Sequence, residues 1–294
     1  MTNPGLQTSR FLPSTTMPNR LRVFSVTSGK GGVGKTNIVI NLAVAFSRKG
    51  RKVLIIDADL GLANVDIMLG LTPRENIHTL LSGEKTIDDV LVPGPAGIFV
   101  LPASSGIYEL THLSPEQRIA LLTHLDGLED RFDTVLIDTG AGISSNVMYF
   151  NAAAQEIIVV VTPENTSIAD AYALIKVLST NFGQKHFHVL PNMVSNEFEA
   201  VNTFRKIERA AERFLNIGLD YAGFIVRDEG MRKAANRQKP LMILDPVSAA
   251  ARSVKFVAEG LLATQARGEL KGTPQFFWKR LLVEEQAPAV QGVP

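Results

Sequence analysis

The chain has 294 residues, of which 45% are hydrophobic and 20% are charged, so its length suits one large domain with tails. Its formal net charge is +1, so the charge shows no broad basic field and does not indicate binding to nucleic acid. The chain contains no cysteine, which excludes disulfides and any cysteine-ligated zinc or iron–sulfur centre.

Residues 1–20 are predicted to form a flexible N-terminal arm. Three prolines (Pro4, Pro13 and Pro18) interrupt it, and it lacks the continuous apolar core of a signal peptide. No stretch of the chain approaches the ~18 uninterrupted apolar residues of a membrane-spanning helix. We therefore expect a cytoplasmic protein.

Between residues 21 and 263, short β-branched runs alternate with longer amphipathic segments, which is typical of a parallel sheet covered by helices. The predicted strands are 22–27, 52–57, 99–101, 134–138, 157–161, 187–190 and 223–226. Most are continuously apolar, as strands buried on both faces are. The predicted fold class is α/β, with a mostly parallel central β-sheet of about seven or eight strands flanked by helices.

Two helices have clear starts or ends in this region. The segment 36–49 is predicted to be helical and to end at Gly50, the residue favoured after a helix. Ser114, Pro115 and Gln117 form a capping box with proline at the first helical position, which predicts that a second helix begins there.

A glycine-rich segment follows the first strand and opens the first long helix. Its residues are Gly29, Lys30, Gly31, Gly32, Val33, Gly34, Lys35 and Thr36. This P-loop pattern predicts that backbone N–H groups surround phosphate oxygens at the start of a helix. Lys35 is expected to bridge the β- and γ-phosphates, and the Thr36 hydroxyl to bind Mg²⁺. The alternative is an ordinary glycine-rich turn.

Four charged residues near this loop are further candidates. Lys30 can reach across a two-fold axis to the phosphates of a second subunit, or it is simply an exposed loop lysine. Asp138 ends an apolar strand, where it can hold Mg²⁺ through water. Asp57 and Asp59 end another strand, where a carboxylate can orient the attacking water. The alternative role for either of these two is N-capping of the following turn.

These residues carry a resemblance to a known family. The segment 30–36 resembles the deviant Walker A motif of the MinD/ParA ATPases, and the segments 57–66 and 138–142 resemble their two switch regions. The resemblance extends over about 22–262. Within the class, the segments 34–37, 170–176 and 190–193 are similar to the FlhG (FleN) subfamily, which regulates flagellar number.

The resemblance implies the MinD-like P-loop NTPase fold and a homodimer that closes around ATP and Mg²⁺. It implies that Lys30 contacts the partner's nucleotide, that Asp59 positions water, and that Asp57 and Asp138 lie near the metal. It also implies a set of further nucleotide contacts, with the asparagine at 192 bonding to adenine. That set is Asn37, Asn64, Glu164, Asn192 and Asp228.

The C-terminal region is predicted to hold a linker (264–275), an amphipathic helix (276–285) and a disordered end (286–294). The helix begins with Phe276, Phe277, Trp278, Lys279, Arg280, Leu281 and Leu282. On a helix, the rings at 277 and 278 align with the leucines four residues later, and the two cations fall on the other side. This arrangement suits anionic lipid, or alternatively a groove on the domain itself. The resemblance favours a membrane anchor. Both alternatives can also hold in turn, with the tail tucked in the monomer and exposed in the dimer.

We therefore expect an ATP-dependent dimerising ATPase that associates with the inner face of the cell membrane and regulates flagellar number or placement. The alternatives are a ParA-like DNA-partition ATPase and a nucleotide-dependent antiactivator. The resemblance implies partners among an FlhF-type GTPase, flagellar C-ring proteins and a flagellar transcription activator. The Asp-Gln-Ala peptide through which such proteins stimulate the GTPase does not occur between Met1 and Asn19.

Overall fold

The computed structural model describes residues 21–60, 62–103, 113–128, 130–264 and 275–276. Its strands are β1 (Arg22–Ser28), β2 (Val53–Ala58), β3 (Val92–Pro93), β4 (Phe99–Leu101), β5 (Thr134–Ala141), β6 (Glu156–Val161), β7 (Phe187–Val194), β8 (Leu219–Tyr221) and β9 (Ile225–Val226). Its helices are α1 (Lys35–Arg48), α2 (Val65–Leu69), α3 (Ile77–Leu81), α4 (Ile87–Val90), the short 3₁₀ helix η1 (Pro95–Gly97), α5 (Pro115–Asp126), α6 (Ser145–Ala153), α7 (Asn165–Phe182), α8 (Glu197–Leu215), α9 (Glu229–Asn236), α10 (Leu241–Leu244) and α11 (Ala249–Ala263). The predicted arm, most of the linker, and residues 277–294 lie outside the described residues.

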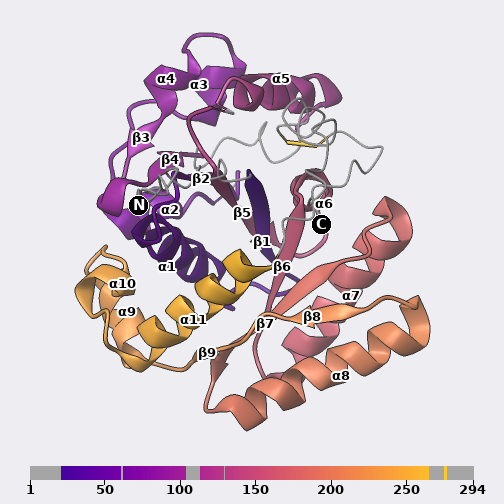
Figure 1. Cartoon of the computed structure of the whole chain (residues 1–294). Helices are drawn as coiled ribbons and strands as arrows, with labels where there is room; N and C mark the ends of the chain where they lie inside the picture. Colours follow the sequence, from indigo (N-terminus) through magenta and orange to yellow (C-terminus); the bar gives the residue numbers. More distant parts are fainter. Residues whose placement is uncertain (1–20, 61, 104–112, 129, 265–274, 277–294) are drawn as a thin grey trace, which may run out of the picture.

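The strands form one twisted sheet in the order β3-β4-β2-β5-β1-β6-β7-β8, with β9 also paired to β7 (Figure 1). All pairs are parallel except β3 with β4, which confirms the predicted α/β fold class. All seven predicted strands are present. Strands β3 and β8 were not predicted, because they have only two and three residues and are too short to show a pattern.

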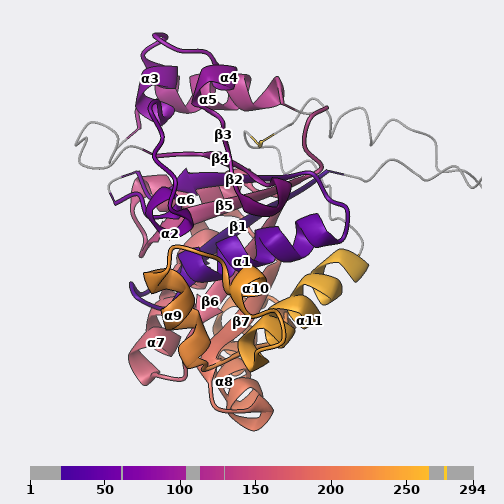
Figure 2. The same ribbon diagram turned by 90° about the vertical axis from the view of Figure 1, so that its left-hand side faces the viewer.

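Helices cover both faces of the sheet, with α1 and α11 packed on the same face (Figure 2). Strand β2 shows how the sequence divides its side chains between the two layers. Val53 and Ile55 pack in the core with α1 and α11, whereas Leu54 and Ile56 pack with α5 and α6. All four are fully buried, so this strand is apolar throughout because both of its faces are covered.

The predicted helix starts are found as well. At the start of α5, the Ser114 hydroxyl accepts a hydrogen bond from the N–H of Gln117, whose side chain accepts one from the N–H of Ser114 at 2.8 Å. Helix α1 begins at Lys35 directly after the glycine-rich loop, and it ends before Gly50, which has a positive φ of 82°. The loop is therefore held between a central strand and a buried helix.

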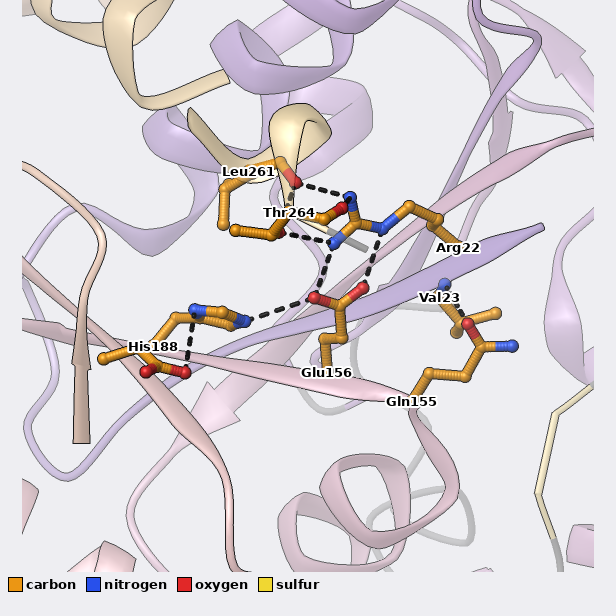
Figure 3. A network of polar contacts seen from close by, with 8 residues as sticks. Arg22, Val23, Gln155, Glu156, His188, Leu261 and Thr264 are labelled. Atoms are coloured by element: carbon orange, nitrogen blue, oxygen red, sulfur yellow. Dashed lines mark hydrogen bonds and ion pairs between the residues drawn. The ribbon is translucent and has the colours of Figure 1, made fainter. Parts of the chain in front are cut away.

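A buried polar network crosses the amino-terminal edge of the sheet (Figure 3). The Arg22 guanidinium on β1 bonds to both carboxylate oxygens of Glu156 on β6, at 2.8 and 2.6 Å. It also donates to the main-chain carbonyls of Leu261 and Thr264 at the end of α11. On the other side of the carboxylate, Nε2 of His188 lies 3.2 Å from Oε2 of Glu156. Arg22 thereby satisfies carbonyls that a helix end leaves unpaired, and it fixes α11 to the sheet.

Replacing Glu156 with glutamine is expected to destabilise the fold by about 3–5 kcal/mol, because it leaves the buried Arg22 charge without its counter-ion. Urea denaturation of the full chain measures this. The control is Asp220→Asn, which removes a half-exposed carboxylate 3.9 Å from His188 and is expected to cost less than about 0.5 kcal/mol. Equal losses in the two variants would contradict the assignment of the Arg22–Glu156 pair as the centre of the network.

Candidate nucleotide-binding site

The glycine-rich loop connects β1 to α1 at the carboxyl edge of the sheet. Gly34 has a φ of 92°, and a side chain there would start 2.7 Å from the Asn192 amide nitrogen. A Cβ at Gly29 would lie 2.1 Å from the main-chain oxygen of Asp170 at α7. Both positions therefore require glycine. Because glycine has no side chain, the backbone N–H groups at the start of α1 are accessible and can attract phosphate.

The loop borders a cavity of about 730 Å³, called the phosphate cavity below. Its lining includes Gly31, Gly32, Gly34, Lys35, Thr36, Asn37, Asp59, Leu62, Asn64, Met68, Thr139, Gly140, Ser144, Asn146 and Val147. Three segments that are far apart in the sequence thus meet around one space. The predicted phosphate, switch and metal residues at positions 35, 36, 37, 59 and 64 all contribute to it.

Asp57 lies beneath this cavity and is almost fully buried. Its carboxylate accepts hydrogen bonds from the backbone N–H groups of Asp59, Asn64 and Val65, each at 3.1 Å. Asp57 therefore shapes the loop before α2 and caps that helix, which is the capping role considered above. Burial raises the pKa of Asp57 well above its usual range, and the neighbouring Asp138 raises it further.

Asp138 stands directly opposite Asp57 on β5 and is equally buried. Burial raises the pKa of Asp138 to about 7, although a hydrogen bond with Thr36 and the charge of Lys35 oppose the shift. Its Oδ1 atom has no hydrogen-bond partner among the described residues. A free, buried carboxylate oxygen beside the Thr36 hydroxyl fits a Mg²⁺ site, because Mg²⁺ prefers hard oxygen ligands and water.

Lys35 and Asp59 both line the phosphate cavity, and they are near enough for their charges to interact. The Lys35 ammonium donates to the Ser28 hydroxyl at 3.0 Å, and burial lowers the pKa of Lys35, although Asp138 and Asp59 oppose that shift. Burial also raises the pKa of the Asp59 carboxyl. A Cβ built on Gly140 would lie 3.4 Å from Oδ1 of Asp59. The Asp59 carboxylate thus lies between the two switch segments, where it can accept a proton from a water molecule in the cavity.

Lys30 points to the rim of the site. Its ammonium lies 2.7 Å from Oε2 of Glu164 and 3.0 Å from the hydroxyl of Thr166, at the start of α7. This contact lowers the pKa of the Glu164 carboxyl. Both partners are partly exposed, so the ion pair contributes little to stability. Lys30 therefore makes a contact within the chain that a better partner can replace.

A second cavity of about 390 Å³ lies on the other side of the loop and is called the base pocket below. It is lined by Gly34, Asn37, Ile38, Asn192, Met193, Ile225, Val226, Arg227, Asp228, Met231, Arg232 and Ala235. The Asn192 amide group donates a hydrogen bond to the Val33 carbonyl at 2.7 Å. The predicted base residue is thus oriented by the P-loop itself.

Asp228 also borders the base pocket, but its carboxylate is used within the fold. It accepts hydrogen bonds from the backbone N–H of Gly230 at 2.7 Å and from that of Ala250 at 3.1 Å. Asp228 therefore caps α9 and the start of α11, a role that the sequence analysis did not predict. Met193 was not predicted as a site residue either. It lines both cavities, and its backbone is left-handed, with a φ of 57°.

Phe276, predicted to face lipid, is fully buried in this structure. Its ring stacks on Phe150 with centroids 6.0 Å apart and meets Tyr149 edge-on, and its N–H donates to the Ala153 carbonyl at 3.0 Å. This residue therefore completes the core beside α6 and does not contribute to a lipid-facing surface here. The other predicted membrane residues lie outside the described residues, namely Phe277, Trp278, Lys279, Arg280, Leu281 and Leu282. None of the helices that the structure describes is long and apolar enough to cross a bilayer.

Comparison with known proteins agrees with this geometry. A family model described as the CobQ/CobB/MinD/ParA nucleotide binding domain matches residues 24–241. The chain is 43% identical to the antiactivator FleN of Pseudomonas aeruginosa over 89% of this chain and 94% of that protein. It is 32% identical to the flagellum site-determining protein YlxH of Helicobacter pylori, over 89% and 90% of the two chains.

Solved structures of MinD from two Pyrococcus species have the same fold. The cell-division ATPase from Pyrococcus furiosus superposes with a TM-score of 0.69 at 26% identity, covering 82% of this chain and 98% of that one. The protein from Pyrococcus horikoshii, which was solved with Mg-ADP, has a TM-score of 0.68 at 25% identity, covering 82% and 96%.

The variant Asp138→Asn is expected to melt several degrees above the wild type near pH 8 when no nucleotide is present. The raised pKa means that the folded state binds the Asp138 proton more tightly than the unfolded state does. Stability is therefore lost as the pH rises from the usual value of 3.8 to about 7, and asparagine removes that loss.

Melting curves measured across this pH range test the assignment. The difference in melting temperature between the two proteins should grow from about pH 4 to pH 7 and then level off. A constant difference across the range would show that Asp138 does not titrate in the folded protein as we expect.

Proposed function

Since the chain belongs to the CobQ/CobB/MinD/ParA nucleotide-binding family and is one of its P-loop ATPases, we propose that it is an ATP-switched regulator of flagellar number or placement. It binds ATP with Mg²⁺ and hydrolyses ATP. The regulatory role is supported by its identity to FleN, an antiactivator, and to YlxH, a flagellum site-determining protein. A cytoplasmic location on the inner face of the cell membrane completes the proposal.

In the proposed cycle, two copies of the chain close face to face around two ATP molecules. The supporting observation is that Lys30, which belongs to the loop that borders the phosphate cavity, is held only by an exposed ion pair. Leu62, in the first switch segment, and Ile143, directly after the second, are 71% and 56% exposed. An apolar rim around a phosphate site suits a second protein surface better than water. Lys30 then exchanges Glu164 for a phosphate of the partner's nucleotide.

Hydrolysis follows from the residues around the cavity. Lys35 and the loop N–H groups stabilise the negative charge on the β- and γ-phosphate oxygens, while Asp59 orients a water molecule and accepts its proton. A carboxyl with a raised pKa is a better base near neutral pH than an ordinary aspartate. Thr36 and Asp138 would hold Mg²⁺, directly or through water, and the ion would supply positive charge to the phosphates when bound.

The state of the site is proposed to control the tail through α6. This helix begins beside the phosphate cavity, at Ser144 and Val147, and its last turn holds Phe276 through the Ala153 carbonyl. A nine-residue helix moves as one body, so a shift of its first turn displaces its last. Closure around ATP would release Phe276 and with it the residues predicted to bind anionic lipid. Two tails on one dimer bind far better than one.

A second candidate function is a nucleotide-dependent antiactivator that binds a flagellar transcription activator. The 43% identity to the antiactivator FleN favours it. The two functions are compatible, because the same ATP-closed dimer can expose both a partner-binding surface and the tail. Light scattering measures whether the protein forms a complex with a purified flagellar transcription activator. A complex that forms in ATP but not in ADP supports this function, and no complex in either nucleotide contradicts it.

Asp59→Ala is expected to bind ATP with nearly wild-type affinity, to lose at least about 100-fold in turnover, and to remain a dimer in ATP. Size-exclusion chromatography with light scattering measures the dimer, and phosphate release measures turnover. Adding Lys30→Ala to this variant should return it to a monomer, because the contact in trans is then missing. A double variant that still dimerises in ATP would refute the proposed role of Lys30.

Co-sedimentation with vesicles of anionic lipid tests the tail. The wild type should pellet with ATP and much less with ADP, whereas Trp278→Glu should abolish pelleting. Phe276→Ala should increase pelleting in ADP, because it removes the ring packed on Phe150. The control Phe214→Glu, which changes an exposed aromatic residue of α8, should behave as the wild type. Pelleting on DNA rather than on vesicles would support the partition alternative.

A further inference from the structure

The loop between α9 and α10 contacts the switch helix α2, which is remote in sequence. The side-chain amide of Gln238 donates to the main-chain oxygen of Ile67 at 2.9 Å, 171 residues away. A Cβ built on Gly70, just after α2, would lie 3.4 Å from the Cβ of Gln238. Gln238 therefore touches the carboxyl-terminal end of α2 at two points.

The backbone of Gln238 is unusual for its residue type. Its φ is 53°, in the left-handed region that side chains other than those of glycine and asparagine rarely adopt. Here it ends α9, because the Gln238 N–H donates to the Ala235 carbonyl at 2.9 Å and the Lys239 N–H donates to the Ala234 carbonyl at 3.1 Å, a bonding pattern that commonly terminates a helix. The end of α9 thus fixes the backbone from which the Gln238 side chain reaches Ile67.

On one side, Gln238 directly follows α9, and this helix forms part of the wall of the base pocket. Helix α9 contributes Met231, Arg232 and Ala235 to that pocket. The helix is supported from behind by Asn41 of α1, which is buried. The Asn41 side chain accepts a hydrogen bond from the N–H of Met242 at 2.9 Å, and its amide nitrogen lies 3.6 Å from the sulfur of Met231. A base that fills the pocket thus presses on an element that α1 holds in place.

On the other side, α2 reaches the phosphate cavity. Its first N–H groups are bound by the buried Asp57 carboxylate, and Met68 lines the cavity itself. The helix has only five residues. The Asp57 carboxylate bonds to its first turn, and the Gln238 amide bonds to its last turn. Its position also sets that of Asn64, the residue before it, and of the short loop that carries Asp59.

We propose that Gln238 is a positioning residue that transmits occupation of the base pocket to α2, so that bound adenine places the first switch segment for hydrolysis. This inference rests on the proposed catalytic role of Asp59. The amide donor is the essential group, because the acceptor it meets is a main-chain carbonyl.

Hydrogen exchange on the full-length protein tests the coupling without turnover. The wild type is compared in Mg-ADP, which fills both cavities, and in Mg-pyrophosphate, which fills only the phosphate cavity, each at a concentration that protects the P-loop. We expect the amides of α2 to be protected more by Mg-ADP than by Mg-pyrophosphate. In Gln238→Glu, which removes the donor but keeps the shape, this difference should disappear while protection of the P-loop remains.

The control is Arg237→Ala, which changes the exposed neighbour and should retain the wild-type difference. The proposal is overturned if Gln238→Glu keeps the extra protection of α2 in Mg-ADP. It is also overturned if the two ligands protect α2 equally in the wild type, because no signal from the base then exists.

Steady-state kinetics provides the second measurement. Gln238→Glu should lower kcat for ATP about two- to tenfold, the range expected for one hydrogen bond, while KM stays within about twofold. A merely structural role would instead raise KM or lower the melting temperature with kcat unchanged. Asp59→Ala is measured beside it. If that variant turns over normally, the catalytic assignment fails, whereas the exchange result still decides the coupling.

Discussion

The site depends on two carboxyl groups, those of Asp57 and Asp138, which are buried side by side on adjacent strands. Buried like charges repel each other and lack water, so each must be compensated by hydrogen bonds or by a cation. Asp57 recruits three N–H groups and thereby folds the first switch loop, whereas Asp138 relies on Thr36 and Lys35. One carboxylate oxygen of Asp138 has no hydrogen-bond partner among the described residues. A metal ion bound together with the nucleotide can compensate this buried charge.

Sequence patterns predicted the central strands and the P-loop, because continuous apolar runs and glycine spacing are local properties. They could not separate metal binding from capping at Asp57, since the choice depends on which N–H groups the fold brings near. Asp228 shows the same limit, because one of its two bonds reaches Ala250, 22 residues away. At Phe276, an apolar ring before a basic pair suits lipid and core equally, and only the tertiary structure places it against Phe150.

Each of the two switch segments is followed by a short helix whose far end contacts a residue that is remote in sequence. Helix α2 ends against Gln238, and α6 ends against Phe276. A helix transmits a displacement along its length because its backbone bonds are internal and resist bending. In the proposed cycle the phosphate cavity is therefore coupled to the base pocket through α2 and to the tail through α6. Neither coupling requires movement of the central sheet.

The energies of these contacts set the order of events in that cycle. The Lys30–Glu164 pair is open to solvent and opposes exchange only weakly, so Lys30 is free to move as soon as a second nucleotide approaches. Burial of a phenylalanine ring contributes about 1.5–3 kcal/mol, so releasing Phe276 from both subunits costs roughly twice that. Binding of ATP to one chain brings no contact from a second subunit to offset this cost. In the proposed cycle the tail is therefore released only after the dimer has closed, so membrane association would report dimerisation rather than nucleotide binding.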